Sequence, residues 1–160
     1  MNPFQIILNA LWASLDRPAL LALVPEGNRH KFADNIPVKE EIATRDRPEL
    51  RIVPVAGLFN PNITNADTEI TKQFQIQAIT GSRKLAPVSE LEFEIFRAVL
   101  APDFDELEWE GKSFVQNVRI VSATEMEKNQ DLNQGIVGWV TILTVQVSMI
   151  FQTSDLVKEA

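Results

Sequence analysis

The sequence has no cysteine, so a disulfide framework and a thiolate metal site are both excluded. It also has no apolar run near the roughly 18 residues that a membrane-spanning helix needs. The opening stretch, MNPFQIILNALWASL, lacks the early positive charge of a secretory signal. We therefore expect a soluble protein that is made inside the cell and has no membrane segment.

Histidine is nearly as scarce. His30 is the only one, in the polar stretch GNRHK, and no serine sits in a G-x-S-x-G pattern that would supply an activated nucleophile. The stretch GSRK at 81–84 lacks the spacing of a phosphate-binding loop. We interpret His30 as a solvated loop residue and 81–84 as a turn. No catalytic or cofactor-binding residue is predicted, which favours a protein that is not an enzyme.

Positive charge is outweighed by negative charge: the formal net charge is −7 and the pI is near 4.8. This balance argues against a general phosphate-binding surface. Many of the acids fall in DFDELEWEG at 103–111, and carboxylates of this kind can ligate a hard cation. The EF-hand pattern is missing there, including its central glycine, so we interpret the segment as a solvated turn and predict no metal site.

What the sequence does contain is a succession of helix and strand patterns in 160 residues, which we expect to form a single domain, 1–160. Helices are predicted over 3–15 and 88–100, with a further short helix over 19–24, and strands over 49–55, 68–80, 114–124 and 138–153. The main order α-β-β-α-β-β predicts an α+β fold, a mainly antiparallel sheet with two helices packed on one face. We expect a long polar loop at 25–48, a turn at 57–67, a polar hairpin tip at 125–135 and a flexible C-terminal tail at 154–160.

The strand over 138–153, GWVTILTVQVSMIFQT, is unusually long. Its odd-numbered residues from Trp139 to Phe151 are nearly all apolar, and the even-numbered residues between them are mixed. Such a strand spans roughly 50 Å, whereas a usual strand has about five or six residues. Two interpretations stay open: the strand bends or breaks within its own fold, or it reaches a neighbouring subunit.

The layout resembles the tail terminator proteins of tailed bacteriophages, of the minor tail protein U kind. The features that carry the resemblance are the helix NPFQIILNALWASL, the strand opened by RPELRIVPV, the polar-faced strand TEITKQFQIQAIT, the helix SELEFEIFRAVL and the final hairpin ending in GWVTILTVQVSMIF, together roughly residues 3–153. The resemblance implies a protein without catalytic chemistry that forms a ring, commonly a hexamer. The ring caps the tail tube, stops its polymerisation and offers a docking surface to the head.

The resemblance also implies the partners. These are further copies of the chain, the major tail tube protein, a head-completion or neck protein, and DNA that passes through the channel without specific binding. The expected location is the head-proximal end of the virion tail, after assembly in the host cytoplasm. As a hypothesis, the long strand supplies a sheet edge to the next subunit. The candidate interface residues are Arg29, His30, Lys31, Arg45, Arg47, Lys128, Asn129, Asp131, Gln146 and Ser148.

Two alternatives stay open. One is another head–tail connector, such as a neck protein, or a tail-tube protein, which shares the antiparallel sheet and the ring-forming habit. A tube protein polymerises into filaments, whereas a terminator stops at one ring. The other alternative is a small cytosolic enzyme or ligand-binding α+β domain, for which a deep apolar pocket with convergent polar groups is expected.

Overall fold

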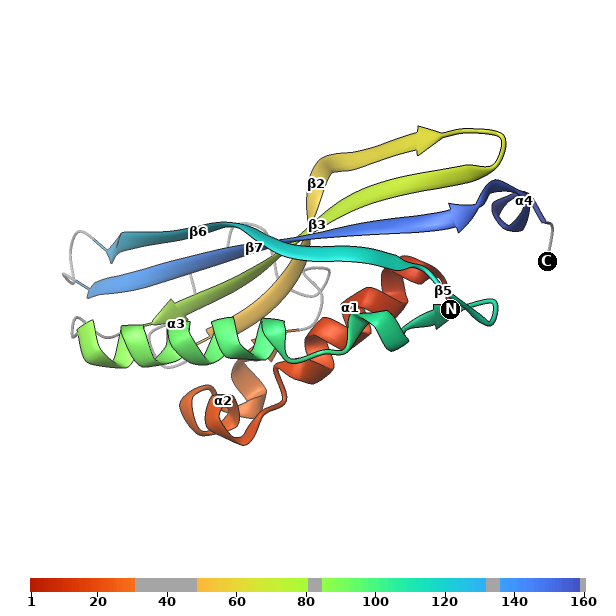
Figure 1. Cartoon of the computed structure of the whole chain (residues 1–160). Helices are drawn as coiled ribbons and strands as arrows, with labels where there is room; N and C mark the ends of the chain where they lie inside the picture. The colour runs from red at the N-terminus through yellow and green to blue at the C-terminus, as the bar shows by residue number, and fades with distance from the viewer. Residues whose placement is uncertain (31–48, 81–84, 132–135, 159–160) are drawn as a thin grey trace.

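The computed structural model describes residues 1–30, 49–80, 85–131 and 136–158 (Figure 1). The first helix, α1 (Pro3–Ser14), begins where its sequence predicts. The Asn2 side chain accepts a hydrogen bond from the Gln5 amide at 2.9 Å, and Pro3 occupies the first turn, where a missing N–H costs nothing. Two short elements follow, α2 (Pro18–Leu23) and the 3₁₀ turn η1 (Glu26–Asn28).

One five-stranded sheet forms the body of the molecule, in the order β1-β2-β3-β7-β6. Its strands are β1 (Arg29–His30), β2 (Glu49–Ile63), β3 (Asp67–Thr80), β6 (Val115–Asp131) and β7 (Ile136–Gln152). β1 runs parallel to β2, and all other neighbouring strands are antiparallel. The sheet therefore consists mainly of two long hairpins, β2–β3 and β6–β7, which join where β3 pairs with β7.

The helices α1 and α3 (Leu85–Leu100) lie along one face of this sheet (Figure 1). Buried residues alternate along β3 and β7 and follow helical spacing on both helices, so the core lies between the two layers. The largest fully buried side chains are Ile7, Leu11, Leu15, Leu20, Val24, Leu50, Ile52, Phe74, Ile76, Ile95 and Met149. The predicted α+β class is confirmed.

The chain between α3 and β6 forms small elements in the segment predicted as a solvated acidic turn. These are the 3₁₀ turn η4 (Phe104–Glu106) and a hairpin of β4 (Glu108–Trp109) with β5 (Lys112–Ser113). Glu110 and Gly111 turn this hairpin with positive φ angles of 52° and 74°. Positive φ angles at both central residues are what a type I′ hairpin turn requires, and glycine adopts them without strain.

Several elements extend further than predicted. β2 continues through the expected turn to Ile63, with a register shift between Pro54 and Phe59 where the strand changes direction in Figure 1. β6 continues to Asp131 through most of the expected polar tip, because pairing with β7 satisfies its backbone whatever its side chains are. A short helix, α4 (Thr153–Leu156), forms in the expected tail. Of the expected polar loop, 31–48 lies outside the described residues.

The position of β7 corrects the hypothesis about the long strand. β7 does not lie at an edge: it pairs with β3 from Trp139 to Gln152 on one side and with β6 from Ile136 to Met149 on the other. Its backbone groups are therefore already engaged on both sides along most of its length. The length of β7 serves its own sheet, and any edge offered to a neighbour belongs to other strands.

Candidate assembly interface

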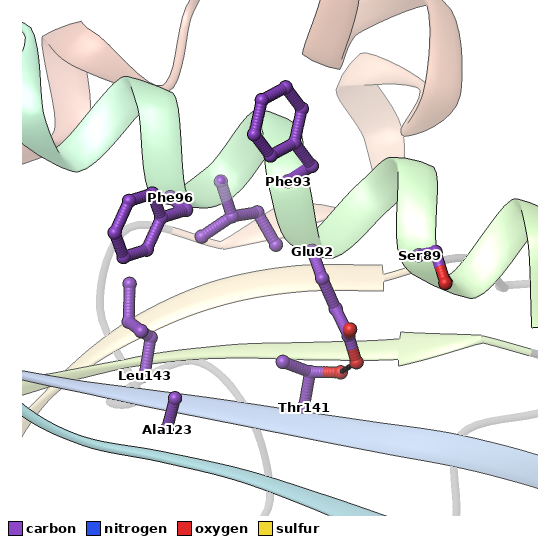
Figure 2. Close-up of a pocket in the computed structure, with 8 residues that line it drawn as sticks. Ser89, Glu92, Phe93, Phe96, Ala123, Thr141 and Leu143 are labelled. Carbon is purple, nitrogen blue, oxygen red and sulfur yellow. Dashed lines mark hydrogen bonds between the residues drawn. The ribbon is translucent and has the colours of Figure 1, made fainter.

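An open, largely apolar groove of about 480 Å³ lies between α3 and the sheet. We call it the α3–β6 groove, because the outermost strand β6 borders it. Its apolar lining is Phe93, Ile95, Phe96, Ala123 and Leu143, and its polar lining is Ser89, Glu92 and Thr141. Figure 2 shows Phe96 reaching from α3 toward Leu143 of β7 and Ala123 of β6. The groove is therefore bounded by a helix on one side and the sheet on the other.

The helix α3 carries two apolar stripes, and the second borders the groove through Phe93 and Phe96. One stripe (Leu91, Ile95, Ala98 and Val99) is buried in the core, as its spacing predicts. The second stripe is Phe93, Phe96 and Leu100, at positions i, i+3 and i+7, with 60%, 43% and 63% of each residue exposed. A helix that is apolar on both sides is normally covered on both sides. The second stripe thus marks a surface that a partner can cover.

The polar end of the groove joins α3 to the sheet. Thr141 Oγ1 donates a hydrogen bond of 2.7 Å to Glu92 Oε1 (Figure 2). Thr141 is buried and Glu92 is half-buried. The groove therefore combines a carboxylate at one end with aromatic rings along its length, which suits a partner segment that carries both apolar and cationic side chains.

The two lateral edges of the sheet have features that discourage pairing with a strand of another subunit. In the part of the chain that the structure describes, no strand pairs with the outer side of β6, and β1 covers only Leu50 and Arg51 of β2. β6 has register shifts at three places along its pairing with β7, and β2 contains Pro54 and Pro61. Bulges and prolines are devices that discourage backbone pairing at an edge. Side-chain contacts are therefore better suited than strand addition to hold a neighbour here.

The sheet face opposite α1 and α3 is lined by amides and guanidinium groups. Arg51 Nε donates to Gln77 Oε1 at 2.8 Å. The Gln146 amide lies 3.0 Å from that of Gln73, and with its oxygen toward Arg119 it accepts from the guanidinium at 3.0 and 3.2 Å. This is the polar glutamine face that the alternation of β3 predicts. Its side chains bond one another across the strands.

Arg29, a predicted interface residue, has a different role. Its side chain is only 2% exposed, and Nη2 donates to the Leu15 carbonyl at the end of α1. Nη1 lies 2.9 Å from Asp16 Oδ1, and the guanidinium lies 5.4 Å from the ring centroid of Trp12. A cation is favourable at a helix C-terminus, where carbonyl groups lack partners. Arg29 therefore anchors α1 within the fold, and its burial leaves little of the side chain for a partner to contact.

The other predicted interface residues are dispersed. Gln146 and Ser148 lie on the central strand β7, half-buried on the glutamine face, where Ser148 pairs with Thr71 and Asn117. His30 lies on β1 opposite Arg51. Lys128, Asn129 and Asp131 lie on β6 and pair with β7, and Asp131 is the last residue of the strand. Lys31, Arg45 and Arg47 lie outside the described residues.

The residues that line the α3–β6 groove were not among the predicted interface residues. A signal for them is present in the sequence, since Phe93, Phe96 and Leu100 repeat at helical spacing beside the core stripe. Spacing predicts the buried stripe correctly, but it does not say that the exposed stripe borders a groove. The groove depends on how α3 lies against β6 and β7, which the spacing does not give.

A second cluster lies at the other end of β7 and fastens the C-terminal segment. Lys112 Nζ lies 2.8 Å from Asp155 Oδ2 and 2.9 Å from Gln152 Oε1, and Lys158 Nζ lies 2.9 Å from Asp155 Oδ1. The hydrogen bond from Lys112, followed by that from Lys158, lowers the pKa of Asp155 below its ordinary value. The hydrogen bond to Asp155 in turn raises the pKa of Lys158.

Beneath these charges, Phe151 stacks on Phe114 with ring centroids 5.6 Å apart and meets Trp109 edge-on at 5.5 Å. Each group in this cluster bonds or packs against another part of the same chain. The cluster therefore holds the β4–β5 hairpin against β7 and α4.

Over the described ranges, no three His, Cys, Asp or Glu side chains gather as metal ligands would. Nor does any helix in those ranges have the length and apolar character to cross a membrane.

Comparison with known proteins identifies the fold. No family model and no curated protein matches the chain. A solved structure with a similar fold is a chain from the "Virion of native gene transfer agent (GTA) particle". The match has a TM-score of 0.57 at 12% sequence identity, and it covers 89% of this chain and 94% of that chain. At this identity the comparison shows a shared fold, and the coverage shows that the fold extends over nearly the whole of both chains.

Proposed function

We propose that this protein is a structural component of a phage-like virion. The observation that carries the proposal is the shared fold with a chain of a gene transfer agent virion, over nearly the full length of both chains. A match of that extent makes the whole fold, rather than a local motif, the common feature. Within the virion, we propose that the chain forms a ring that caps the tail tube, stops tube polymerisation and presents a docking surface to the head.

The surface of the molecule supports an assembly role. Two stripes on α3 are apolar and only one is buried in the core, so Phe93, Phe96 and Leu100 form a surface that a second protein can cover. The exposed edge of β6 and most of β2 lie on opposite sides of one sheet. A subunit with two different lateral surfaces is suited to head-to-tail contacts, which close into a ring when the rotation between copies fits.

The proposed partners follow from this role. They are identical copies in a ring, for which we propose six subunits, the tail tube protein on one side and a head-completion or neck protein on the other. DNA passes through the channel without specific binding. The location is the head-proximal end of the tail. The role needs no catalysis or cofactor, and we propose that the protein is not an enzyme.

One alternative is supported by the same observation. A neck protein or a tail-tube protein is also a virion component, and a sheet with two exposed lateral edges also suits a repeating tube. The two roles differ in how assembly ends. A tube protein polymerises without limit, whereas a terminator stops at a single ring.

The first experiment is light scattering of the purified chain across a range of concentrations. The terminator role is supported by two results together. Light scattering shows a discrete species near six subunits, and tubes become shorter or fixed in length when the chain is added to polymerising tail tube protein. Filaments formed by the chain alone support the tube-protein role. A strict monomer that leaves tube length unchanged contradicts both, and it favours a small ligand-binding domain that uses the α3–β6 groove.

A further inference from the structure

We propose that the C-terminal segment is a releasable clamp that couples two other parts of the chain. The clamp is residues 152–158, which comprise the last residue of β7, the short helix α4 and the two residues after it. The two parts are the β2–β3 tip, residues 61–68, and the β4–β5 hairpin, residues 108–113. Figure 1 shows α4 at the same end of the sheet as the tip. Release of the clamp loosens both parts together, and this coupling does not depend on the proposed ring.

The first residue of α4 holds the tip. The Thr153 amide donates to the Ala66 carbonyl at 3.0 Å, and the Thr153 hydroxyl donates to the Thr64 carbonyl at 2.7 Å. Because a hydroxyl has one proton, the Thr68 hydroxyl is the donor in its contact of 2.9 Å with the Thr153 hydroxyl. Thr68 is buried, so Thr153 supplies an acceptor at a place that water reaches poorly. The position of the tip therefore depends on Thr153.

The next polar residues of the clamp hold the hairpin. Lys112, at the hairpin turn, has its Nζ atom 2.9 Å from Gln152 Oε1 and 2.8 Å from Asp155 Oδ2. The other oxygen of Asp155 lies 2.9 Å from Lys158 Nζ, so the carboxylate is shared between the hairpin and the clamp itself. Residues 152–155 therefore bind the tip and the hairpin at once.

A hollow lies among these three parts of the chain. Its volume is about 210 Å³, and its lining includes Asp67 of the tip, Trp109 and Lys112 of the hairpin, and Asp155 of α4. The atoms that line a hollow lack packing contacts on that side. The bonds made by the clamp therefore carry much of the connection between the tip and the hairpin.

The clamp is held by polar contacts and not by burial. The helix α4, which the structure describes in full, has no buried residue, and Leu156 and Val157 are exposed. The side chains of Lys112 and Lys158 are also exposed, and ion pairs made by such lysines contribute little to stability. A segment with few buried contacts opens at a lower free energy than the whole fold. The clamp therefore has a docked state and a released state, and it bonds the tip and the hairpin in the docked state.

A two-state element that is bonded to two surfaces couples them, and the coupling is reciprocal. The tip is open to a partner, since residues 61–67 are exposed and Ile63 is 68% exposed. A partner that draws the tip away from Thr153 also loosens the hairpin turn around Lys112. A partner that takes Lys112 from Asp155 loosens the tip. Contact at one surface is thus transmitted to the other.

Hydrogen exchange of the full chain, followed by NMR at single amides, tests the coupling. Thr153→Val removes the hydroxyl that binds the tip, and Asp155→Ala removes the carboxylate that binds the hairpin. The proposal predicts that each variant speeds exchange by the same factor at amides in 61–68 and in 108–113. We expect about tenfold for Thr153→Val, which loses two hydrogen bonds, and about threefold for Asp155→Ala, whose ion pairs are exposed.

Two control variants leave these bonds in place. Thr153→Ser keeps the hydroxyl, and Ser154→Ala changes an exposed neighbour on the same helix. Both should exchange within about twofold of the native chain. Amides around Val145, in the central strand, are measured in the same samples. Their exchange should not change, because local release leaves the sheet folded.

Three results overturn the proposal. Faster exchange at the tip alone in Thr153→Val, or at the hairpin alone in Asp155→Ala, shows that the two parts open independently. Equal acceleration around Val145 shows that the whole fold opens and that the clamp has no released state of its own. Unchanged exchange at both places shows that the bonds of Thr153 and Asp155 hold neither part.

Discussion

Thr141 of β7 donates a hydrogen bond of 2.7 Å to Glu92 of α3, and so ties the helix that carries the second apolar stripe to the central strand. We expect Thr141→Val to lower the free energy of unfolding by about 1–2 kcal/mol, because it keeps the shape of the side chain but removes a donor from a half-buried carboxylate. Urea unfolding measures the change. Ser89→Ala, in the same groove, is the control and should stay within about 0.5 kcal/mol. Equal stability of Thr141→Val and the native chain contradicts the expectation.

Arg29 should matter for folding and not for assembly. Arg29→Met removes the hydrogen bond to the Leu15 carbonyl and the ion pair with Asp16 from a buried site. We expect a loss of about 2–4 kcal/mol in the free energy of unfolding. Arg17→Ala is the matched control, since Arg17 makes no side-chain capping hydrogen bond at the start of α2. If Arg29→Met instead abolishes association while the monomer keeps its stability, Arg29 acts at an interface, as predicted from the sequence.

Asp155 should fasten α4 in a pH-dependent way. Its pKa in the folded chain is lowered from the ordinary value of 3.8, chiefly by the hydrogen bond from Lys112. Because the folded-state pKa is the lower one, the stabilisation is complete above the ordinary value and is lost as the pH falls through the folded-state pKa. We therefore expect the NMR signals of Leu156 to stay constant from neutral pH to about pH 4 and to change only in stronger acid. In Asp155→Asn this acid step should disappear; a step that persists there has another source.

A proline at Ser148 separates the edge hypothesis from the observed strand order. Ser148 pairs with Thr71 on one side and Asn117 on the other, so proline removes a ladder hydrogen bond from the centre of the sheet. We expect Ser148→Pro to destabilise the fold by at least about 3 kcal/mol. Circular dichroism during urea unfolding measures it, and Ser148→Ala should remain close to the native chain. A folded Ser148→Pro that merely fails to assemble favours the edge hypothesis.

Periodicity predicted which residues of the long strand face the core. The odd-numbered residues Thr141, Leu143, Val145, Val147, Met149 and Phe151 are buried, as the alternation indicates. In β3, Lys72 interrupts the apolar face but is accommodated there, with its ammonium group 4.8 Å from the Phe4 ring centroid. The α+β class also follows from the pattern of apolar residues. Two amphipathic helices and several strands with one apolar face can bury these faces by packing the helices on the sheet.

The sequence does not show which strand is central. The alternation of apolar and polar residues shows only which face of a strand is buried. The order of the strands depends on pairing between residues that are distant in the chain, such as Phe74 and Val145. For the same reason the polar residues of β6 after Thr124 were interpreted as a tip, although their backbone pairs with β7. Arg29 was predicted as an interface residue, although charged residues that are buried need partners. Its burial depends on the carbonyl of Leu15 and the ring of Trp12, which the fold brings to it.

The central place of β7 also has a consequence for how the chain folds. β7 follows every other strand of the sheet in the chain, so during synthesis β2, β3 and β6 emerge before the strand that joins them. The β2–β3 hairpin can form early from neighbouring residues, but the β3–β7 pairing closes a long loop and is slow for that reason. Until β7 arrives, the edge of β3 that pairs with it has no neighbour, and partly made chains expose the backbone groups of that edge. Folding of the sheet is therefore completed late, and conditions that slow synthesis lengthen the period in which aggregation competes with it.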